Sequence, residues 1–159
     1  MEGPYSRRPM PTHHETKRLP YTAQQMYDLV ADVARYPEFL PWNSAARIRS
    51  RTPIPGGELM EADLVISFKV FRERFGSRVQ LLSEDRRILT EYIDGPFRFM
   101  RSTWEFRDAP GGCEVEFFVD FEFRNAILQG IIGVVFNEAM TRIVRAFERR
   151  AADLYGRAA

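Results

Sequence analysis

Apolar and polar residues alternate along the middle of the chain with a period of two. This period is typical of β-strands that bury one face and expose the other. It is clearest from Met60 to Val70, where acidic, serine and lysine side chains separate most of the apolar ones. The pattern predicts strands at 45–51, 60–70, 75–81, 88–93, 100–106 and 115–123. The turns between them are short, and such connections predict an antiparallel sheet.

The first part of the chain predicts one strand and two short helices. Residues 13–19 alternate, and a proline follows the last of them. Thr22 and Gln25 have the spacing of a capping box, so a helix is predicted from there to about Ala34. A second helical turn is predicted at 36–42, where prolines restrict how far it can extend.

The last predicted element is a helix from Asn125 to Ala159, which changes character along its length. Residues 126–136 are apolar nearly all round, whereas residues 137–157 are amphipathic and rich in arginine. At 1.5 Å per residue the helix is roughly 45 Å long, enough to cross the sheet. A helix that is apolar all round needs apolar surroundings, and a sheet covers one face only. The remaining surface meets a ligand, a partner or a membrane, and we expect a ligand cavity.

The predicted elements indicate an α+β fold in which one strand, two short helices, six strands and a long helix follow one another. One polar and one apolar face per strand indicate a sheet covered on one side. A chain of 159 residues is expected to form one domain, which we assign to residues 12–157. Residues 1–11 contain three prolines and no apolar pattern, so we expect a disordered tail there.

The composition of the chain argues against several classes of function. The net charge of +1 creates no field that would attract DNA. The single cysteine, Cys113, excludes an intramolecular disulfide, and two histidines with one cysteine cannot build the usual zinc site. The chain has neither an uninterrupted apolar run of about 18 residues nor an apolar signal-peptide core. We expect a cytoplasmic protein, with a peripheral position at the inner face of the cytoplasmic membrane as the alternative.

Several segments resemble those of one known family and occur in the order expected for it. They are Leu29–Val33 with Tyr36–Trp42, Gly95–Phe97 with Trp104–Phe106, Val119–Phe123, and Ala146–Ala151 with Leu154–Gly156. Through them the chain resembles the coenzyme Q-binding protein and ribosome association toxin family of START-like (helix-grip, polyketide cyclase-like) proteins. Asn43 departs from the pattern, because many members have a cysteine there. The resemblance covers about residues 13–156 and implies a curved antiparallel sheet wrapped around a long C-terminal helix, with a hydrophobic cavity.

The resemblance also implies two activities. The first is non-enzymatic binding of ubiquinone or a related isoprenoid quinone by a lipid carrier or chaperone that supports respiratory electron transport. The alternative is a ribosome-binding toxin, with the large ribosomal subunit as partner, that blocks subunit association and translation. An enzyme of the cyclase or aromatase kind is a third hypothesis, resting on fold analogy alone. No Ser/His/Asp or Cys/His set can be assembled from the sequence, so we expect neither an enzyme nor a catalytic cofactor or metal.

The candidate ligand-binding residues are apolar side chains expected to face the cavity. From the sheet they are Phe68, Val79, Leu81, Met100, Trp104, Phe117, Val119 and Phe121, and from the helix Leu128, Ile132, Phe136 and Met140. Most of these positions are equally compatible with an ordinary core. Phe39, Leu40 and Trp42 would either frame the cavity mouth, where they could also contact a membrane surface, or staple the short helices to the sheet. Tyr92 would orient a quinone oxygen or form an ordinary core hydrogen bond.

Two features of the last helix have two interpretations each. Gly130 and Gly133 each cost roughly 1 kcal/mol relative to alanine in a helix interior. They allow either close packing against a strand or a thin, mobile wall that lets a bulky ligand pass. Arginines gather toward the helix end, where they either complement the negative end of the helix dipole or form a ribosome-docking patch. They are Arg142, Arg145, Arg149 and Arg150.

Overall fold

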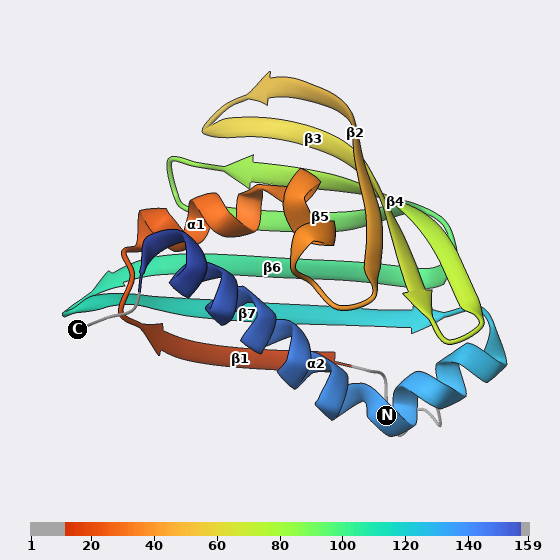
Figure 1. Ribbon diagram of the computed structural model, residues 1–159. Helices are drawn as coiled ribbons and strands as arrows, with labels where there is room; N and C mark the ends of the chain where they lie inside the picture. Colours follow the sequence, from red (N-terminus) through yellow and green to blue (C-terminus); the bar gives the residue numbers. More distant parts are fainter. Residues whose placement is uncertain (1–11, 157–159) are drawn as a thin grey trace, which may run out of the picture.

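The computed structural model describes residues 12–156 of the chain. Strand β1 (Thr12–Leu19) is followed by helix α1 (Ala23–Ala31) and the short 3-10 helix η2 (Val33–Glu38). Six strands come next: β2 (Asn43–Ile54), β3 (Gly57–Phe68), β4 (Phe71–Leu82), β5 (Arg87–Asp94), β6 (Phe97–Ala109) and β7 (Gly112–Phe123). The long helix α2 (Ala126–Tyr155) is the last element (Figure 1). The predicted tail at 1–11 lies outside the described residues.

All strands belong to one seven-stranded antiparallel sheet with the order β1-β7-β6-β5-β4-β3-β2. Strands β2 to β7 follow one another as hairpins, and β1 pairs with β7 from Thr12 opposite Asp120 to Leu19 opposite Cys113. The first strand of the chain therefore lies beside the last one. This arrangement confirms the predicted α+β helix-grip fold.

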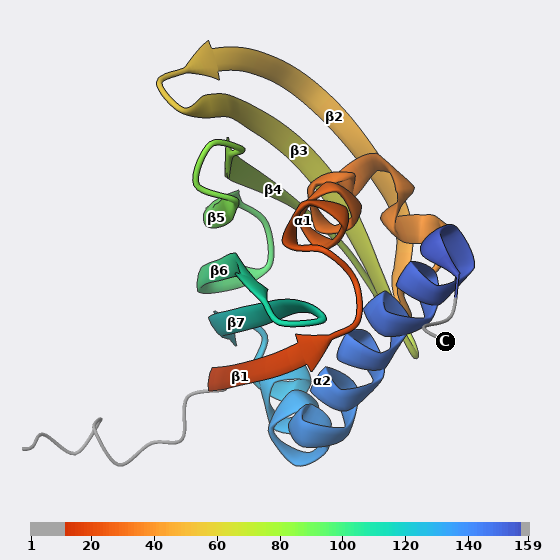
Figure 2. The ribbon, with the colours of Figure 1, turned by 90° about the vertical axis from the view of Figure 1, so that its left-hand side faces the viewer.

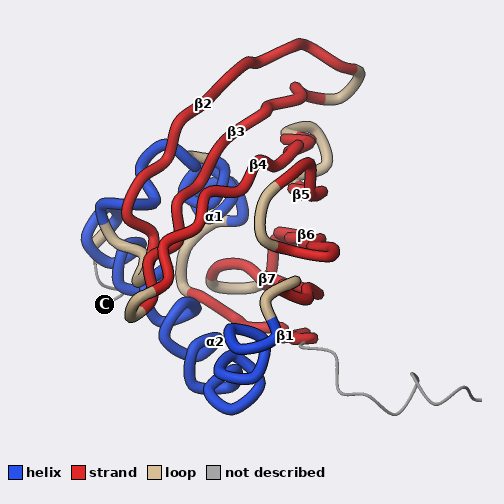
Figure 3. Tube along the Cα trace, turned by 90° about the vertical axis from the view of Figure 1, so that its right-hand side faces the viewer, coloured by secondary structure: helices blue, strands red, loops and turns tan. Residues whose placement is uncertain are grey.

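The sheet is strongly curved, and all helices lie on its concave side (Figures 1 and 2). Register shifts interrupt the pairing of β2 with β3, of β4 with β5 and of β6 with β7. Such irregularities bend a strand and increase its local twist. The tube view shows the result, a sheet that wraps around α1 and α2 (Figure 3).

Helix α1 begins with the predicted capping box. The Gln25 backbone N–H donates to the Thr22 hydroxyl (3.0 Å), and the Thr22 N–H donates to the Gln25 side-chain oxygen (2.9 Å). The helix ends at Ala31, earlier than predicted, because Asp32 leaves the helical region with φ −84° and ψ 66°. The second helical turn is the 3-10 helix η2, so it starts and ends before the predicted 36–42 segment does.

The tip of the β3–β4 hairpin differs from the prediction. The alternating pattern extends the strand to Val70, but β3 ends at Phe68 because Lys69 adopts a left-handed conformation with φ 54°. Strand β4 then begins at Phe71 rather than Phe75, and Val70 lies at the exposed tip. Alternation alone does not reveal such a tight turn, because the turn residues continue the apolar–polar pattern.

Helix α2 comprises 30 residues and is capped at its N-terminus by Asn125, whose side-chain oxygen accepts the N–H groups of Ile127 and Leu128. It ends at Tyr155, and residues 157–159 of the predicted helix lie outside the described part of the chain. By length and composition alone α2 could cross a bilayer, although Gln129, Asn137 and Glu138 interrupt its apolar residues. In the fold its inner side packs against the sheet.

The buried residues form two clusters along the concave face. The first surrounds α1 and includes Met26, Val30, Met60 and Phe147. The second lies between the other end of the sheet and the first half of α2, and it is rich in phenylalanine. Helix α1 covers only the end of the sheet that holds the first cluster. The end that holds the second cluster is covered by α2 alone, and the cavity lies there.

Candidate ligand cavity

A cavity of about 250 Å³ lies within the second cluster, between the sheet and α2. The sheet contributes Ile66, Phe68, Phe71, Glu73, Phe75, Phe97, Met100, Phe117, Val119, Phe121 and Phe123. Helix α2 contributes Leu128, Ile132, Val135, Ala139, Met140 and Ile143, and Trp42 comes from the segment before β2. A pocket with so uniformly apolar a lining suits a hydrophobic ligand.

The phenylalanines of the lining hold one another in place. Phe97 stacks on Phe123 with ring centroids 4.6 Å apart, and it meets Phe75 and Phe121 edge to face at 5.2 and 5.7 Å. Such aromatic pairs add stability beyond the area they bury. The sheet therefore forms a rigid wall of the cavity, and α2 forms the opposite wall.

The lining contains several of the predicted ligand-binding residues. They are Trp42, Phe68, Met100, Phe117, Val119, Phe121, Leu128, Ile132 and Met140. Phe136 is buried in the same cluster and packs on Phe121 at 5.7 Å, behind the lining. Tyr92 also packs against this cluster, but its hydroxyl accepts the Phe97 backbone N–H at 3.1 Å and does not line the cavity.

The other predicted residues lie away from the cavity. Val79 and Leu81 are 3% and 5% exposed in the cluster beneath α1, and Trp104 packs against that cluster. Phe39 and Leu40 also pack there, with the Phe39 ring 5.4 Å from that of Phe147. These contacts correspond to the stapling interpretation of the 36–42 segment, and Trp42 alone of its aromatic residues borders the cavity.

Trp42 is held in an unusual conformation. Its φ is 64°, which is uncommon for a bulky residue, and its carbonyl accepts the Ser67 N–H at 2.8 Å. The indole meets the Phe68 ring edge to face at 5.9 Å, and the Arg142 guanidinium lies 5.7 Å from its centre. These contacts fix Trp42 between the β3–β4 hairpin and α2, at the edge of the cavity.

Two polar side chains lie at one side of the cavity. Glu73 is the one ionisable residue among the described residues that line it. Asn43 lies two strands away, on the other side of Ile66, because Ile66 pairs with both residues. The Asn43 side-chain oxygen is buried and has no hydrogen-bond partner among residues 12–156. An amide and a carboxylate thus flank one lining isoleucine, while Ser102 and His13 pair with the lining Val119.

Three other groups that could react, one phenol, one hydroxyl and one thiol, are held inside the fold. The buried Tyr36 hydroxyl donates to the Val30 carbonyl, and burial raises the pKa of this phenol well above its usual range. The Ser77 hydroxyl donates to the Ala62 carbonyl at 3.4 Å. Burial also raises the pKa of the Cys113 thiol, which favours the unreactive protonated form. Within residues 12–156 no group of three or more His, Cys, Asp or Glu could hold a metal ion.

Gly130 and Gly133 lie in the part of α2 that covers the cavity. A Cβ atom added at either position would meet nothing within 4 Å, so the glycines do not serve close packing against a strand. Figure 1 shows that α2 changes direction within its first half, where both glycines lie. Glycine lowers the stability of a helix interior, so this wall of the cavity is intrinsically weaker than the rest of α2.

We predict that the double substitution Gly130→Ala and Gly133→Ala stabilises the protein by up to about 2 kcal/mol, because each glycine costs about 1 kcal/mol in a helix. Urea unfolding would measure the gain, and release of a bound ligand should become slower. Gly112→Ala is the control, since its Cβ would overlap the Leu19 backbone oxygen and should destabilise the protein. A double variant less stable than the wild type would contradict an open environment at these positions.

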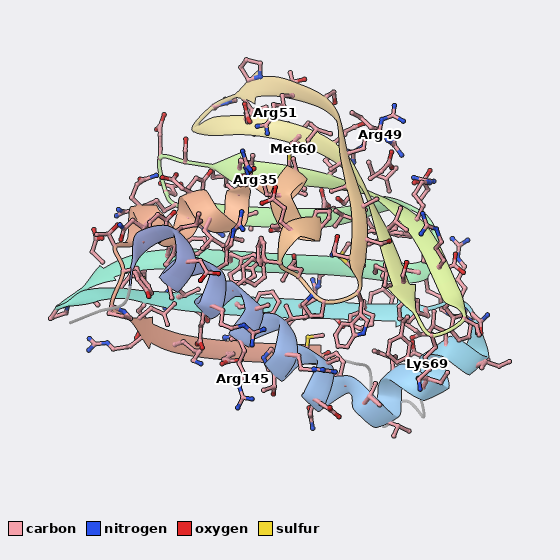
Figure 4. The ribbon with its side chains drawn as sticks, in the orientation of Figure 1. Arg35, Arg49, Arg51, Met60, Lys69 and Arg145 are labelled. Carbon is pink, nitrogen blue, oxygen red and sulfur yellow. The ribbon has the colours of Figure 1, made fainter. Side chains whose placement is uncertain are left out.

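A second feature of α2 is a row of arginines beyond the cavity. Arg142, Arg145 and Arg149 are exposed and recur at helical spacing. None of them forms an ion pair with another residue in the described range, whereas Arg150 pairs with Glu38 at 2.7 Å. Arg145 projects from α2 away from the sheet (Figure 4). The row therefore presents unneutralised positive charge to solvent.

The chain was compared with known proteins. A family model described as polyketide cyclase / dehydrase and lipid transport matches residues 19–148. The chain is 38% identical over 148 residues to the ribosome association toxin RatA of Rickettsia prowazekii, covering 91% of this chain and 99% of that protein. It is 39% identical over 147 residues to RatA of Escherichia coli, covering 92% and 90%.

The chain is also similar to a mitochondrial coenzyme Q-binding protein. The chain is 30% identical over 150 residues to the coenzyme Q-binding protein COQ10 homolog B of Xenopus laevis, covering 91% of this chain and 59% of that protein. Among solved structures, an 18 kDa protein from Caulobacter crescentus matches with a TM-score of 0.77 and 32% identity, covering 92% and 99%. The Zhui aromatase/cyclase from a Streptomyces species matches with a TM-score of 0.73, 88% and 92% coverage and 16% identity, which shows the fold alone.

Proposed function

Because the chain belongs to the START-like polyketide cyclase/dehydrase and lipid transport family, we propose that it binds a hydrophobic molecule in the cavity between the sheet and α2. The proposed ligand is ubiquinone or a related isoprenoid quinone. The protein would act as a lipid carrier or chaperone that supports respiratory electron transport. The observation that carries the proposal is the cavity itself, whose lining is apolar apart from Glu73. The name of the Xenopus relative supports the choice of a quinone.

The polar side of the cavity would receive the quinone ring. The Asn43 amide can donate to a quinone oxygen, and the Glu73 carboxylate can accept from the hydroxyl of a reduced quinone. The apolar remainder would hold the ring edges and the start of the isoprenoid tail. Binding would come mainly from burial of apolar surface, at about 25 cal/mol per Å² before ordering costs.

The cavity volume limits how much of the ligand is enclosed. About 250 Å³ is below the range of about 300–1,000 Å³ that small-molecule pockets occupy. It would hold a quinone head with a short part of the tail, and a longer tail would leave through the mouth. We propose no catalytic role and no catalytic cofactor. The proposed location is the cytoplasm, with transient contact at the inner face of the cytoplasmic membrane.

A fluorescence titration tests the proposal. The chain has two tryptophans, of which Trp42 lines the cavity and Trp104 lies 4.2 Å from the lining ring of Phe117. A short-tailed ubiquinone analogue should quench this fluorescence and saturate at one ligand per protein. A saturated hydrocarbon alcohol of similar length serves as the control for non-specific apolar binding. Quenching that never saturates, or a site occupied equally by the alcohol, would contradict a quinone site.

The second candidate function is ribosome binding, as in the relatives named ribosome association toxin. The observation that favours it is the exposed row of Arg142, Arg145 and Arg149, because nucleic acid attracts unneutralised arginine. The large ribosomal subunit would be the partner, and the outcome would be blocked subunit association and translation. This activity needs the surface of α2 rather than the cavity, so the two functions can be separated by mutation.

We predict that Arg145→Glu with Arg149→Glu abolishes growth inhibition on overexpression and co-sedimentation with the large ribosomal subunit, because charge reversal repels phosphate. Arg78→Glu with Arg101→Glu is the matched control, since it changes the net charge equally on the other face of the sheet. Inhibition that persists unchanged in the α2 variant would exclude this surface as the ribosome-binding one.

A further inference from the structure

Three exposed apolar side chains lie beside residues that line the cavity. Val70, at the tip of the β3–β4 hairpin, is 92% exposed, and Ile127 and Val134 on α2 are 70% and 86% exposed. Single exposed apolar residues are common on protein surfaces. These three differ because their neighbours in sequence line the cavity from its two sides: Phe68 and Phe71 on the hairpin, and Leu128, Ile132 and Val135 on the helix.

The outer side of α2 is unusual for a surface helix. Ile127, Gly130 and Val134 share the outward face, since they are spaced by three and four residues. Residues 126–136 contain no charged side chain, whereas a surface helix normally carries charges on its outer side. Within the most apolar stretch of α2 only 22% of the residues are buried. The first half of the helix therefore presents apolar surface both to the cavity and away from it.

Positive charges border this apolar surface. The Lys69 ammonium lies 5.6 Å from the Phe68 ring centre, at the hairpin tip seen in Figure 4, and Arg142 lies over Trp42. Arg72 follows the hairpin tip, and Arg124 directly precedes the N-terminal cap of α2. None of the four forms an ion pair with another residue between 12 and 156. The acidic residues nearest in sequence are Glu73, on the cavity side, Glu122, which pairs with Arg98 at 2.9 Å, and Glu138, one turn beyond Val134.

We propose that this lip surface, formed by Val70, Ile127 and Val134 with their bordering cations Lys69, Arg72, Arg124 and Arg142, docks on an anionic lipid bilayer. The inference rests on the proposed function and deepens it by assigning the surface through which a lipid enters. Apolar side chains would enter the boundary between headgroups and acyl chains, and the cations would contact lipid phosphates. The docking surface differs from the one expected from sequence, because Phe39 and Leu40 pack inside the fold.

The cavity volume favours a bilayer over a protein as the occupant. Since about 250 Å³ encloses only part of a long-tailed lipid, the rest of the tail needs apolar surroundings that continue from the mouth. A bilayer provides them directly, and it is also where such a lipid resides. The outer side of α2 is apolar and uncharged, and cations border it. This combination is typical of surfaces that bind anionic membranes.

Flotation with protein-free vesicles tests the proposal with the full chain. Vesicles of phosphatidylcholine alone are compared with vesicles of equal parts phosphatidylcholine and phosphatidylglycerol. The wild type should float with the anionic vesicles and much less with the neutral ones. The triple variant Val70→Ser, Ile127→Ser and Val134→Ser should bind about tenfold more weakly, a change that corresponds to about 1.4 kcal/mol. Leu154→Ser is the control, because Leu154 is 51% exposed at the far end of α2.

A titration of the same variants without vesicles separates this proposal from the quinone site. The triple variant should bind a short-tailed quinone as the wild type does, since its substituted side chains point away from the lining. Failure of wild-type protein to float with anionic vesicles would overturn the membrane assignment even if the quinone binds. Equal flotation of the triple variant and the wild type would overturn the assignment of the lip surface. Flotation with a failed quinone titration would overturn the proposed function and leave docking intact.

Discussion

Replacing Val119 with aspartate is expected to leave the protein folded but unable to hold its ligand. Val119 is half-buried on β7, lines the cavity, and pairs with Ser102 of β6 and His13 of β1. A carboxylate there can be hydrated while the cavity is empty, but a hydrophobic ligand would strip it of water at a cost of several kcal/mol. We expect the dissociation constant for a short-tailed quinone to rise about a hundredfold or more, or about 2.7 kcal/mol.

Val65→Asp provides the matched control for this experiment. Val65 lies on β3 between the inward-facing Leu64 and Ile66, so it points to the opposite face of the sheet. The same chemical change at this position should leave quinone affinity unaltered. Circular dichroism and gel filtration establish that both variants are folded. Should Val119→Asp fail to fold, Ala139→Phe blocks the cavity without adding charge. Undiminished affinity in a folded Val119→Asp protein would show that the ligand does not occupy this cavity.

The largest loss of stability is expected from Phe97→Ala. Phe97 is 4% exposed and contacts the rings of Phe75, Phe121 and Phe123, so its removal eliminates several aromatic contacts and enlarges the cavity. Substitutions of this kind cost about 3–5 kcal/mol. Urea unfolding measures the loss. Because the side chain lines the cavity, the folded fraction should also accept a bulkier quinone head than the wild type does.

Phe118→Ala is the corresponding control on the outer face of β7. Phe118 is partly exposed and contacts the Arg101 guanidinium at 5.5 Å, outside the buried clusters. Its replacement should cost about 1 kcal/mol or less. If Phe97→Ala costs no more than Phe118→Ala, the phenylalanine cluster is not the rigid wall described above, and the placement of the cavity against it is wrong.

The element order could be predicted from sequence because it depends on local signals. Alternation identifies strands, and the Thr22–Gln25 capping box identifies the start of α1 through hydrogen bonds between neighbours. Boundaries were less accurate where a local conformation interrupts a continuing pattern. Lys69 ends β3 by adopting a positive φ, and Asp32 ends α1, although neither residue type demands these conformations.

The cavity could be predicted only in part, because alternation gives the face of a strand but not its position along the sheet. Val79 and Val119 both face inward, yet α1 fills the space above Val79 while only α2 covers Val119. That difference depends on how the helices pack, which the sequence pattern does not encode. Phe97 was missed because it follows a Gly-Pro turn, and Glu73 because the preceding strand was predicted to extend past the hairpin tip.

The central question is whether the cavity holds a lipid in the purified protein. Mass spectrometry of an organic extract from gently purified wild-type protein answers this directly, with Ala139→Phe as the blocked-cavity control. We expect an isoprenoid quinone near one molecule per protein chain in the wild type and little in the control. An extract free of lipid, or one with the same lipid in both proteins, would contradict this expectation and would leave the arginine row of α2 as the basis for function.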